Sequence, residues 1–588
     1  MSDEPFTDSR RLTGANLYFD GAGAALEIAP GIAFDAVTLA RWCDNVAQAR
    51  DTLGWPQRDV VVRPHASGAS LAFAAPVDQL YVATEVGEWA LHAALGMRAD
   101  AAPVDADAVS PRPHAAHFER AEALRVLRDA ALAEANPALC ALLDAAAARG
   151  VPAHADDEVL SIGEGEHAQA WPVAALPVVD TVPWWKLCAV LKAVVTGSNG
   201  KTTTVRLLAA MLRAQGLATG YSSTDGLFVD GQRVDAGDYS GPVGARTVLR
   251  DPRVQAAVLE TARGGLLRRG LVARDARVAV VTNVAADHFG EYGIHDLDAL
   301  AAVKLTVAKA VAADGLLVLN ADDPMLIAHA PRERQIGWFA LRIDDALASG
   351  AIACGVREGH LLLATDAGEH DLGVVADMPL AVGGAARYNI ANIAAAALAA
   401  HAMGIAPDVV AGVLAWFGAG NADNPGRLQR WRLGDVVVLL DYAHNADGLR
   451  GLLEVAAGLR GGGRLALLLG HAGNRLDADF LALAQVAADA RPDRVWLKDI
   501  GGDYLRGRAS GDVAATLRAA LLAAGMGEAA LPVCLDEAQA ARQALAWARP
   551  GDLLVLPVHE PSRRDMVVSL LDRLQASGWQ AGQPLPGE

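Results

Sequence analysis

The sequence predicts an α/β protein of three units: a small α+β module, a central α/β domain with a phosphate-binding loop, and a C-terminal Rossmann-like α/β domain. The chain has 588 residues, too many for a single hydrophobic core. From residue 191 onward, strand-like and helix-like segments alternate, as in a mainly parallel sheet covered by helices. A run rich in Gly, Asn and Pro at residues 418–425 interrupts this alternation and marks a domain boundary.

Residues 1–185 are predicted to hold the N-terminal module and a connector. Strands are expected at 59–63 and 69–75, then an extended run at 79–86 that leads into an amphipathic helix at 89–95. Residues 100–113, rich in Asp, Ala and Pro, predict a loop, and helices are expected at 116–133 and 137–149. From residue 151 to 186 the prolines predict an irregular connector, in which three tryptophans act as packing anchors: Trp171, Trp184 and Trp185.

Residues 186–420 form the predicted central domain, and residues 421–588 the C-terminal one. A less regular region is expected at 335–380. Central strands are predicted at 193–196, 256–260, 278–282 and 315–319, with helices at 202–215, 296–313 and 389–403. C-terminal strands are predicted at 435–441, 464–470, 494–499 and 552–558, with helices between them.

A phosphate-binding turn lies at the start of the central domain. An apolar strand breaks at Gly197, and a periodic helix opens at Gly200-Lys201-Thr202. Glycines let backbone N–H groups approach an anion, and the helix N-terminus adds its free amides and positive dipole end. Lys201 brings a mobile positive charge and Thr202 a hydroxyl for Mg²⁺, so the turn predicts a nucleoside triphosphate site.

Charge and cysteine content narrow the class of protein. The 51 basic and 69 acidic residues give a net charge of −18, which argues against a nucleic-acid or anionic-membrane partner. The N-terminus lacks the basic and apolar parts of a signal peptide, and no apolar run has the length of a membrane span, so a soluble cytoplasmic protein is expected. The cysteines have no metal-ligand spacing and are expected to be reduced core residues: Cys43, Cys140, Cys188, Cys354 and Cys534.

Polar residues follow several predicted strands. Glu260 ends one strand, Asn283 ends another, and Asp287-His288 come one turn later. Ligands of open parallel sheets bind beyond the carboxyl ends of the strands. Together with Thr202, these side chains predict a site for one or two Mg²⁺ ions that bridge triphosphate oxygens.

Seven motifs carry a resemblance to a known family. They cover residues 221–226 (YSSTDG), 237–242 (GDYSGP), 259–270 (LETARGGLLRRG), 282–288 (TNVAADH), 320–324 (NADDP), 386–392 (ARYNIAN) and 441–445 (DYAHN). These runs resemble the Mur-ligase-like part of the cyanophycin synthetase family over roughly residues 186–588. The turn itself resembles that of the Mur ligase superfamily, because Val195 stands where a standard P-loop has its first glycine.

The resemblance is fainter in the N-terminal part, over residues 59–95 and 136–165. It then passes within about twenty residues from Trp171 to the strand before the turn. This implies that the ATP-grasp domain, which adds aspartate in that family, is absent from the chain, and that the chain does not polymerise cyanophycin alone.

The resemblance also implies individual roles. Catalytic roles fall to Lys201, His288 and Lys304, and metal binding to Thr202, Glu260, His288 and Lys304, the last as a lysine carbamylated by CO₂. Contacts to the nucleotide are implied for Thr196, Gly197, Asn199, Gly200, Lys201, Thr202, Thr203, Asn283, Asn389, Asn392, Arg427, Asp441, His444 and Asn445. Contacts to the substrate are implied for Ser223, Ser240, Thr261 and Arg263. The residues alone favour a different interpretation, in which Lys304 is a helix lysine that reaches solvent and Arg263 is a solvated arginine.

The implied reaction uses ATP and Mg²⁺ to convert a carboxylate into an acyl phosphate, which an amine then attacks to give an amide. In the family this half of the protein adds arginine to the β-carboxyl of aspartate, so the substrate expected here is a small molecule or short peptide. A homo-oligomer is also implied. One alternative is an accessory subunit that binds nucleotide or cyanophycin and partners a full synthetase; a P-loop kinase or transport ATPase is disfavoured by Val195 and by the C-terminal α/β domain.

Overall fold

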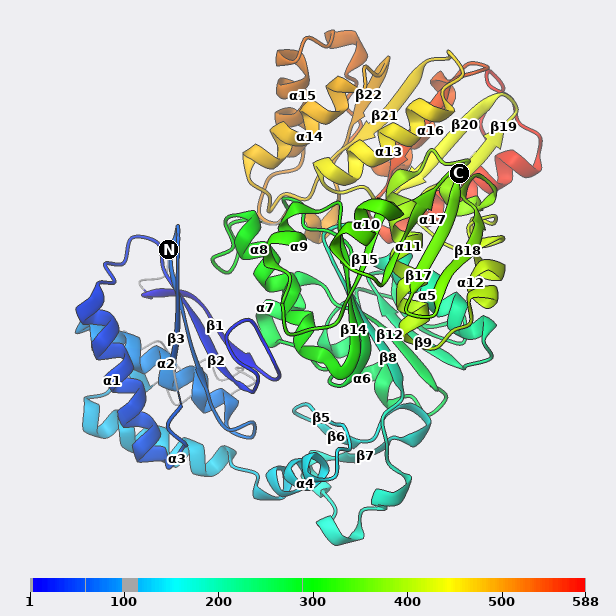
Figure 1. Ribbon diagram of the computed structural model, residues 1–588. Coiled ribbons are helices and arrows are strands. Elements are labelled where there is room, and N and C mark those ends of the chain that lie inside the picture. Colours follow the sequence, from blue (N-terminus) through cyan, green and yellow to red (C-terminus); the bar gives the residue numbers. More distant parts are fainter. Residues whose placement is uncertain (1–3, 59, 98–114, 288, 587–588) are drawn as a thin grey trace.

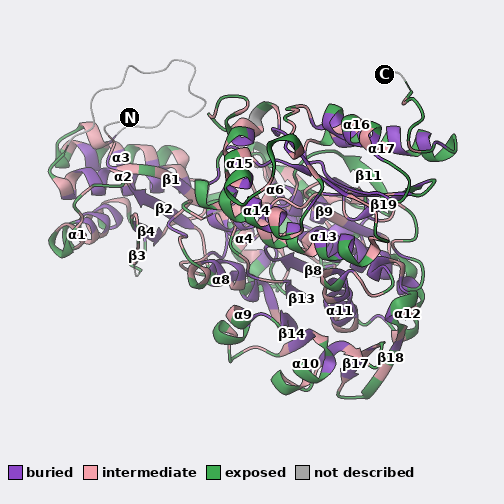
Figure 2. Cartoon of the chain, turned by 90° about the horizontal axis from the view of Figure 1, so that it is seen from above, coloured by how far each residue is buried: buried purple, intermediate pink, exposed green. Residues whose placement is uncertain are grey.

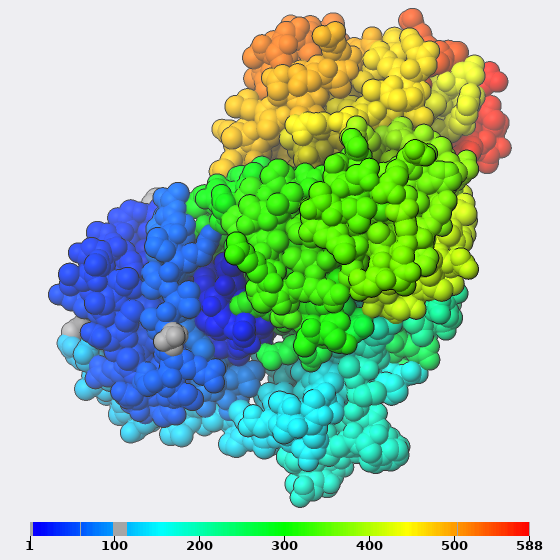
Figure 3. All heavy atoms as spheres, in the orientation of Figure 1, coloured from blue at the N-terminus to red at the C-terminus, as the bar shows by residue number. Residues whose placement is uncertain are grey.

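The computed structural model describes residues 4–58, 60–97, 115–287 and 289–586. Within them the backbone forms four sheets, which belong to an N-terminal module, a connector, a central domain and a C-terminal domain (Figure 1). The N-terminal module lies beside the central domain, and the C-terminal domain lies at another side of it (Figure 3). The most buried residues follow the strands of the central and C-terminal sheets (Figure 2).

The N-terminal module is an antiparallel four-stranded sheet with helices against it. The strand order is β1-β2-β4-β3, and one apolar cluster joins the strands to the helices. The extended run predicted at 79–86 is wrong, because buried apolar residues recur at helical spacing from Leu80 onward and make one continuous helix. The predicted loop at 100–113 lies outside the described residues. The elements are β1 Phe6–Leu12, β2 Gly23–Ile28, α1 Ala36–Leu53, β3 Val60–His65, β4 Gly68–Ala74, α2 Leu80–Leu95 and α3 Arg120–Glu134.

The connector is more regular than the sequence suggested. After α4 (Pro137–Ala148), the strands β5 Ala153–Ala155, β6 Val159–Ile162 and β7 Gln169–Pro172 form a small antiparallel sheet, and short 3₁₀ turns follow. Buried Glu164 accepts a 2.6 Å hydrogen bond from Lys192 and so ties this sheet to the first central strand. Trp171 and Trp184 are half-buried, but Trp185 is 82% exposed, so the prediction that it is a packing anchor is wrong.

The central domain is built on an eleven-stranded sheet of order β11-β10-β9-β12-β8-β13-β14-β15-β16-β17-β18, parallel from β9 to β16 with antiparallel hairpins at both edges. One face packs on α5, α11 and α12, and the other on α6 to α10. The strands are β8 Leu191–Thr196, β9 Thr219–Ser223, β10 Gly226–Val229, β11 Gln232–Asp235, β12 Ala256–Glu260, β13 Ala276–Val281, β14 Val311–Asn320, β15 Ile336–Arg342, β16 Ala353–Arg357, β17 His360–Thr365 and β18 Gly368–Val374. The helices are α5 Lys201–Ala214, α6 Pro242–Arg250, α7 Arg263–Arg269, α8 Leu297–Leu305, α9 Pro324–His329, α10 Ile343–Ser349, α11 Arg387–Ala402 and α12 Pro407–Leu414.

Two predictions for this domain need correction. The helix predicted at 296–313 ends at Leu305, because the chain continues as a 3₁₀ turn and Val311 already pairs with Ala276 in the sheet. The region 335–380 is not irregular. It holds β15 to β18 and α10, whose edge hairpins lack the strand-helix alternation that marks the rest of the domain.

The C-terminal domain has a five-stranded sheet of order β19-β20-β23-β21-β22, in which only the edge strand β19 is antiparallel. Helices α13 to α15 cover one face, and α16 and α17 the other. The elements are β19 Gln429–Leu433, β20 Val436–Asp441, α13 Ala446–Leu459, β21 Leu465–Leu469, α14 Asp477–Asp489, β22 Arg494–Leu497, α15 Asp512–Ala523, α16 Glu537–Trp547, β23 Leu553–Pro557 and α17 Pro561–Ala576.

Two expectations concern the chain as a whole. The cysteines are all free, but they are not all core residues, because Cys354 is buried whereas Cys188 is exposed. Among the described helices, none alone combines the length and the apolar composition of a membrane span. The pair α3 and α4, bent by 64°, meets those criteria only when the two helices are counted together.

Candidate active site

A cavity of about 1700 Å³ lies where the three larger units meet. The carboxyl ends of β8, β12 and β13 open into it from the central domain, and those of β20 and β23 from the C-terminal domain. Thr7 of the N-terminal module and His559 of the C-terminal domain line the same space. The cavity therefore lies where open parallel sheets bind their ligands.

The phosphate-binding turn is shaped by two glycines. Gly197 has φ 146° and Gly200 has φ 86°, a region that favours glycine. A Cβ on Gly197 would come within 1.8 Å of Thr282 Oγ1, and one on Gly200 within 2.2 Å of Asn392 Oδ1. The backbone therefore approaches its neighbours closely, and the N-terminus of α5 faces the cavity, as anion binding requires.

Lys201, Thr202 and Glu260 meet at this turn. Lys201 Nζ donates to the carbonyl oxygens of Gly197 and Ser198 at 3.1 Å each, and the Thr202 hydroxyl donates to Glu260 Oε2 at 2.8 Å. Glu260 is 1% exposed, and its other oxygen, Oε1, has no hydrogen-bond partner. Burial raises the pKa of this carboxyl group. A buried oxygen ligand without a partner, beside a hydroxyl and a phosphate-binding turn, fits a divalent cation such as Mg²⁺.

The tip of the turn is tied to two other strand ends. Asn283, just after β13, accepts from the Asn199 backbone N–H at 2.9 Å. Thr282 Oγ1 donates to the Asn199 carbonyl at 2.6 Å, and Asn445 of the C-terminal domain donates to Asn199 Oδ1 at 3.0 Å. Thr196 is fully buried at the end of β8.

Lys304 lies on α8 and faces the cavity although it is only 3% exposed. Burial first, and then the nearby charge of Lys201, lower its pKa well below the ordinary range, so the neutral amine is favoured. Asp287 and Asp323 act in the opposite direction. His288, which the sequence paired with Lys304, lies outside the described residues.

Most of the predicted nucleotide contacts on α11 and in the C-terminal domain line the same cavity, namely Asn389, Asn392, Arg427, Asp441 and His444, whereas Asn445 does not. Asn389 and Asn392 are buried and hydrogen-bonded to each other at 3.2 Å, and Asn389 also donates to the Leu380 carbonyl. Arg427 lies over the Tyr442 ring at 4.5 Å. Asp441 accepts from the Leu428 backbone N–H at 2.6 Å, and burial raises its pKa.

The turn after β20 connects two domains. His444 Nε2 lies 3.5 Å from Asp287 Oδ2 of the central domain. Asn445 caps α13 by accepting from the Gly448 N–H at 2.8 Å, while its amide reaches Asn199. Thr203, behind the phosphate-binding turn, accepts from Asn424 at 3.2 Å.

The four predicted substrate contacts divide into two pairs. Ser240 and Arg263 line the cavity, whereas Ser223 and Thr261 do not. Ser223 is fully buried and bonds within its own turn, donating to the Gly226 carbonyl at 3.3 Å. Arg263 is only 8% exposed, pairs with Glu291 through one nitrogen, and leaves Nη1 without a partner; burial lowers its pKa.

The sequence did not single out the N-terminal wall of the cavity. Glu27 on β2 accepts from buried Arg10 at 2.7 Å, and Arg10 Nε donates to the Leu267 carbonyl of the central domain at 2.8 Å. Ser67 lies 2.8 Å from His295 Nε2, across the same boundary. Thus the module is fastened to the central domain by polar contacts at the edge of the cavity.

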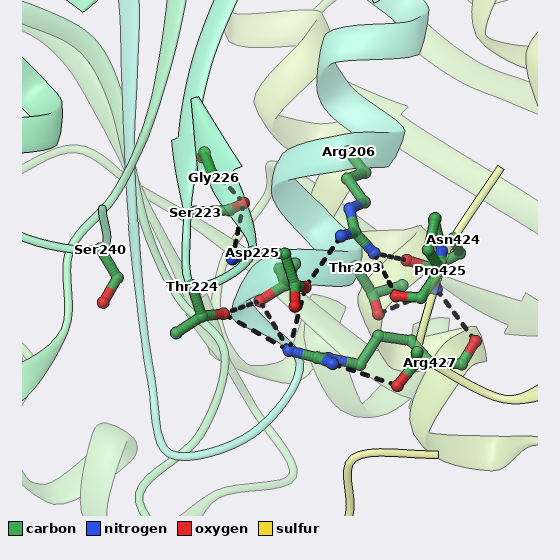
Figure 4. Close-up of polar contacts among 12 residues, drawn as sticks. Thr203, Arg206, Ser223, Thr224, Asp225, Gly226, Ser240, Asn424, Pro425 and Arg427 are labelled. Atoms are coloured by element: carbon green, nitrogen blue, oxygen red, sulfur yellow. Dashed lines mark hydrogen bonds and ion pairs between the residues drawn. The ribbon is translucent and has the colours of Figure 1, made fainter. Parts of the chain in front are cut away.

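Two further charged clusters were not predicted from the sequence. In one, Asp225 lies between Arg206 and Arg427, with Ser240 standing apart (Figure 4). In the other, buried Lys498 donates to Glu537 and to His559 Nδ1, and His559 Nε2 lies 3.1 Å from the Ala443 carbonyl. Asp225 stands inside the motif at 221–226, whereas nothing in the sequence near Lys498 or Glu537 pointed to a site.

Known proteins match this chain over the central and C-terminal domains. The Mur ligase middle domain model matches residues 195–400, and the Mur ligase glutamate ligase domain model matches residues 426–557. Cyanophycin synthetase of Trichormus variabilis is 36% identical over 382 residues, which cover 64% of this chain and 42% of that protein. The chain thus spans about two fifths of the length of that relative.

UDP-N-acetylmuramoyl-L-alanyl-D-glutamate--2,6-diaminopimelate ligase of Xanthomonas campestris pv. campestris is 31% identical over 405 residues, 62% of this chain and 72% of that protein. Among solved structures, E. coli FolC in complex with DHPP and ADP shares a distant similarity of fold, with 20% identity, a TM-score of 0.48, and coverage of 66% of this chain and 89% of that chain. With both domain models matched in order and 31% identity over 72% of a relative, the chain belongs to the Mur ligase family, a family of ATP-dependent ligases.

Proposed function

We propose that this enzyme uses ATP to activate a carboxylate as an acyl phosphate and joins it to an amine as an amide. The carboxylate we propose is the β-carboxyl of aspartate in a cyanophycin-like peptide, and the amine is arginine. The observation that carries the proposal is one continuous cavity, which runs from Lys201, Thr202 and Glu260 to the partly unpartnered guanidinium of Arg263. The similarity to cyanophycin synthetases supports the choice of substrates.

The phosphate end would work by charge neutralisation. The amides at the start of α5 and the mobile Lys201 ammonium would hold the transferring phosphoryl group. Mg²⁺, when bound, neutralises phosphate charge, and Thr202 and Glu260 are the residues that would hold it. Contacts such as that of Asn445 with Asn199 would keep the C-terminal domain closed over the turn and shield the acyl phosphate from water.

We infer that Lys304 becomes carbamylated. Its neutral amine nitrogen attacks the carbon of CO₂, an N–C bond forms, and a proton leaves to solvent. The product is a carbamate anion in a cavity that is also lined by the cationic side chains of Lys201 and Arg263. Labelling with ¹³C-bicarbonate should give a carbamate signal in the NMR spectrum, which Lys304→Arg should lack.

We also infer that the chain carries one ligase activity and lacks the aspartate-adding one. Residues 151–190 form the small connector sheet and its 3₁₀ turns and lead directly into β8. On this proposal, a second enzyme supplies the aspartate backbone, and this chain attaches the amine.

The test is ADP release by the purified protein with ATP, Mg²⁺, a panel of β-Asp-Arg peptides and free amino acids, and candidate amines. Lys201→Ala serves as the inactive reference. We expect one carboxylate and amine pair to raise turnover well above this reference, and mass spectrometry of the product then identifies the amide. If no pair does so, the ligase proposal fails.

A further inference from the structure

One carboxylate holds three arginines where the central and C-terminal domains meet. Asp225 Oδ2 lies 2.9 Å from Arg206 of α5 and 3.5 Å from Arg427, and Asp225 Oδ1 lies 2.8 Å from Arg564 of α17. Figure 4 shows Arg206 reaching Asp225 from α5 and Arg427 approaching from the other side. Asp225 and Arg206 belong to the central domain, whereas Arg427 and Arg564 belong to the C-terminal one, so these four residues form an interdomain clasp.

The clasp is buried and carries excess positive charge. The exposed fractions of the four side chains are 4% for Arg206, 9% for Arg564, 12% for Asp225 and 15% for Arg427. The three guanidinium groups hold the pKa of the Asp225 carboxyl well below its usual range, so the carboxylate is ionised. Because it is their shared counter-charge, its loss would leave three like charges close together in a desolvated place.

Only one member of the clasp reaches the proposed nucleotide site. Arg427 Nη2 lies 3.5 Å from Thr202 Oγ1 and 3.4 Å from Thr224 Oγ1, and its guanidinium covers the Tyr442 ring. Arg564 does not line the cavity, and neither does Arg206, which donates a 2.8 Å hydrogen bond to the Pro425 carbonyl. Arg427 is therefore held by a carboxylate that does not line the cavity, and the same carboxylate also pairs with Arg564.

We propose that Asp225 and Arg564 are positioning residues that hold Arg427 against the phosphate-binding helix and latch the C-terminal domain onto the central one. The inference rests on the proposed nucleotide site. It assigns a role to Arg564, a residue outside the cavity.

Binding of Mg²⁺-ADP, measured by calorimetry, tests this without knowledge of the substrates. Asp225→Asn keeps the shape but removes the counter-charge, and Arg564→Met removes the latch. Each should weaken binding about tenfold, the order of one charge-assisted hydrogen bond. Arg564→Lys, which keeps a positive charge, should fall between Arg564→Met and wild type.

Arg563→Met is the matched control. Arg563 is the neighbouring residue on α17, but it points to Asp536 and Glu560 and is 38% exposed. We expect its Kd within twofold of wild type. Small-angle scattering should show a larger radius of gyration for Asp225→Asn than for wild type, and an unchanged one for Arg563→Met. A substitution that only lowers the melting temperature would not expand the folded molecule.

The outcomes separate the two proposals. If wild type binds Mg²⁺-ADP and folded Arg564→Met binds within twofold of it, the latch is refuted and the ligase proposal stands. If wild type does not bind Mg²⁺-ADP, both fall. Should Arg564→Met not fold, Asp225→Asn replaces it in this test, and binding within twofold of wild type by folded Asp225→Asn refutes the proposal.

Discussion

Two glycines of the phosphate-binding turn leave no room for a methyl group. Gly197→Ala would place a Cβ 1.8 Å from Thr282 Oγ1 at a backbone φ of 146°. We expect it to lower the free energy of unfolding by more than about 1 kcal/mol and to weaken Mg²⁺-ADP binding more than about tenfold. Urea unfolding and calorimetry measure both quantities.

Gly412→Ala provides the control for that change. Gly412 lies in α12, where a methyl group would meet nothing within 4 Å, and an alanine there should stabilise the helix by up to about 1 kcal/mol. Equal losses from Gly197→Ala and Gly412→Ala would show that the turn is not under this steric constraint.

His559 makes stability depend on pH. Burial, followed by the charge of Lys498, lowers its pKa from 6.5 to about 4, so the fold favours the neutral ring. Below pH 6.5 the unfolded chain takes up a proton that the folded chain refuses. Stability from this residue is therefore complete above pH 6.5 and falls by roughly 1.4 kcal/mol per pH unit toward pH 4.

His559→Gln removes that titration. Its free energy of unfolding, measured in urea from pH 7.5 to 4.5, should decline less steeply than that of wild type, by an amount confined to the range below pH 6.5. Parallel curves would contradict the assignment. Since glutamine can still donate to the Ala443 carbonyl, the turn after β20 should stay in place.

At the scale of elements, α13 shows how one side chain serves two purposes. Asn445 caps this helix with its oxygen and contacts the phosphate-binding turn with its amide nitrogen. Asn445→Ala should cost about 1 kcal/mol of stability, because the cap is lost. Asn445→Asp keeps the cap and should leave stability within about 0.5 kcal/mol of wild type.

Both substitutions remove the donor to Asn199, so both should raise the Kd for Mg²⁺-ADP about fivefold, the order of one neutral hydrogen bond. Calorimetry and thermal unfolding on the same samples distinguish the two purposes. Wild-type affinity in Asn445→Asp would mean that the contact with Asn199 does not shape the turn.

The elements also show where sequence reasoning succeeds. Strands with continuous apolar runs, such as those at 256–260 and 278–282, are predicted within two residues of β12 and β13, because buried parallel strands have that composition. The edge hairpin of β17 and β18 was missed, since β18 is largely polar and exposed and only β17 has an apolar run. The break between α8 and β14 was missed because alanines and valines there suit either structure.

The sequence likewise predicted part of the candidate site and missed the rest. The rule that ligands lie beyond strand ends placed Glu260 and Asn283 at the cavity. The rule does not identify Arg564, because its partner Asp225 is 339 residues away in the chain and no local pattern links the two. Nor did it separate Ser240, which lines the cavity, from Ser223, which is enclosed in its own turn.

At the scale of the whole molecule, Arg10 couples the N-terminal module to the central domain. It is 4% exposed and joins Glu27 to the Leu267 carbonyl. Arg10→Met would leave the buried Glu27 carboxylate short of its counter-charge, and we expect a loss of about 3 kcal/mol. Hydrogen exchange in β1 to β4 should accelerate, while that in β20 to β23 should not.

Arg41 is an exposed arginine on α1 of the same module, so Arg41→Met is the control and should leave the hydrogen-exchange pattern unchanged. An unaltered pattern in Arg10→Met as well would show that the polar contacts at the boundary do not fasten the module.

The interdomain clasp has a consequence for the order in which the protein becomes competent during synthesis. Asp225 leaves the ribosome 339 residues before Arg564. The residues of the phosphate-binding turn and Asp225 are thus made long before Arg564, and at 5–20 residues per second the interval from Asp225 to Arg564 lasts from roughly 17 to 70 seconds. Arg427 is made 202 residues after Asp225 and 137 residues before Arg564, so on the role proposed for Arg564 the nucleotide site gains its latch only after the rest of the clasp has been made.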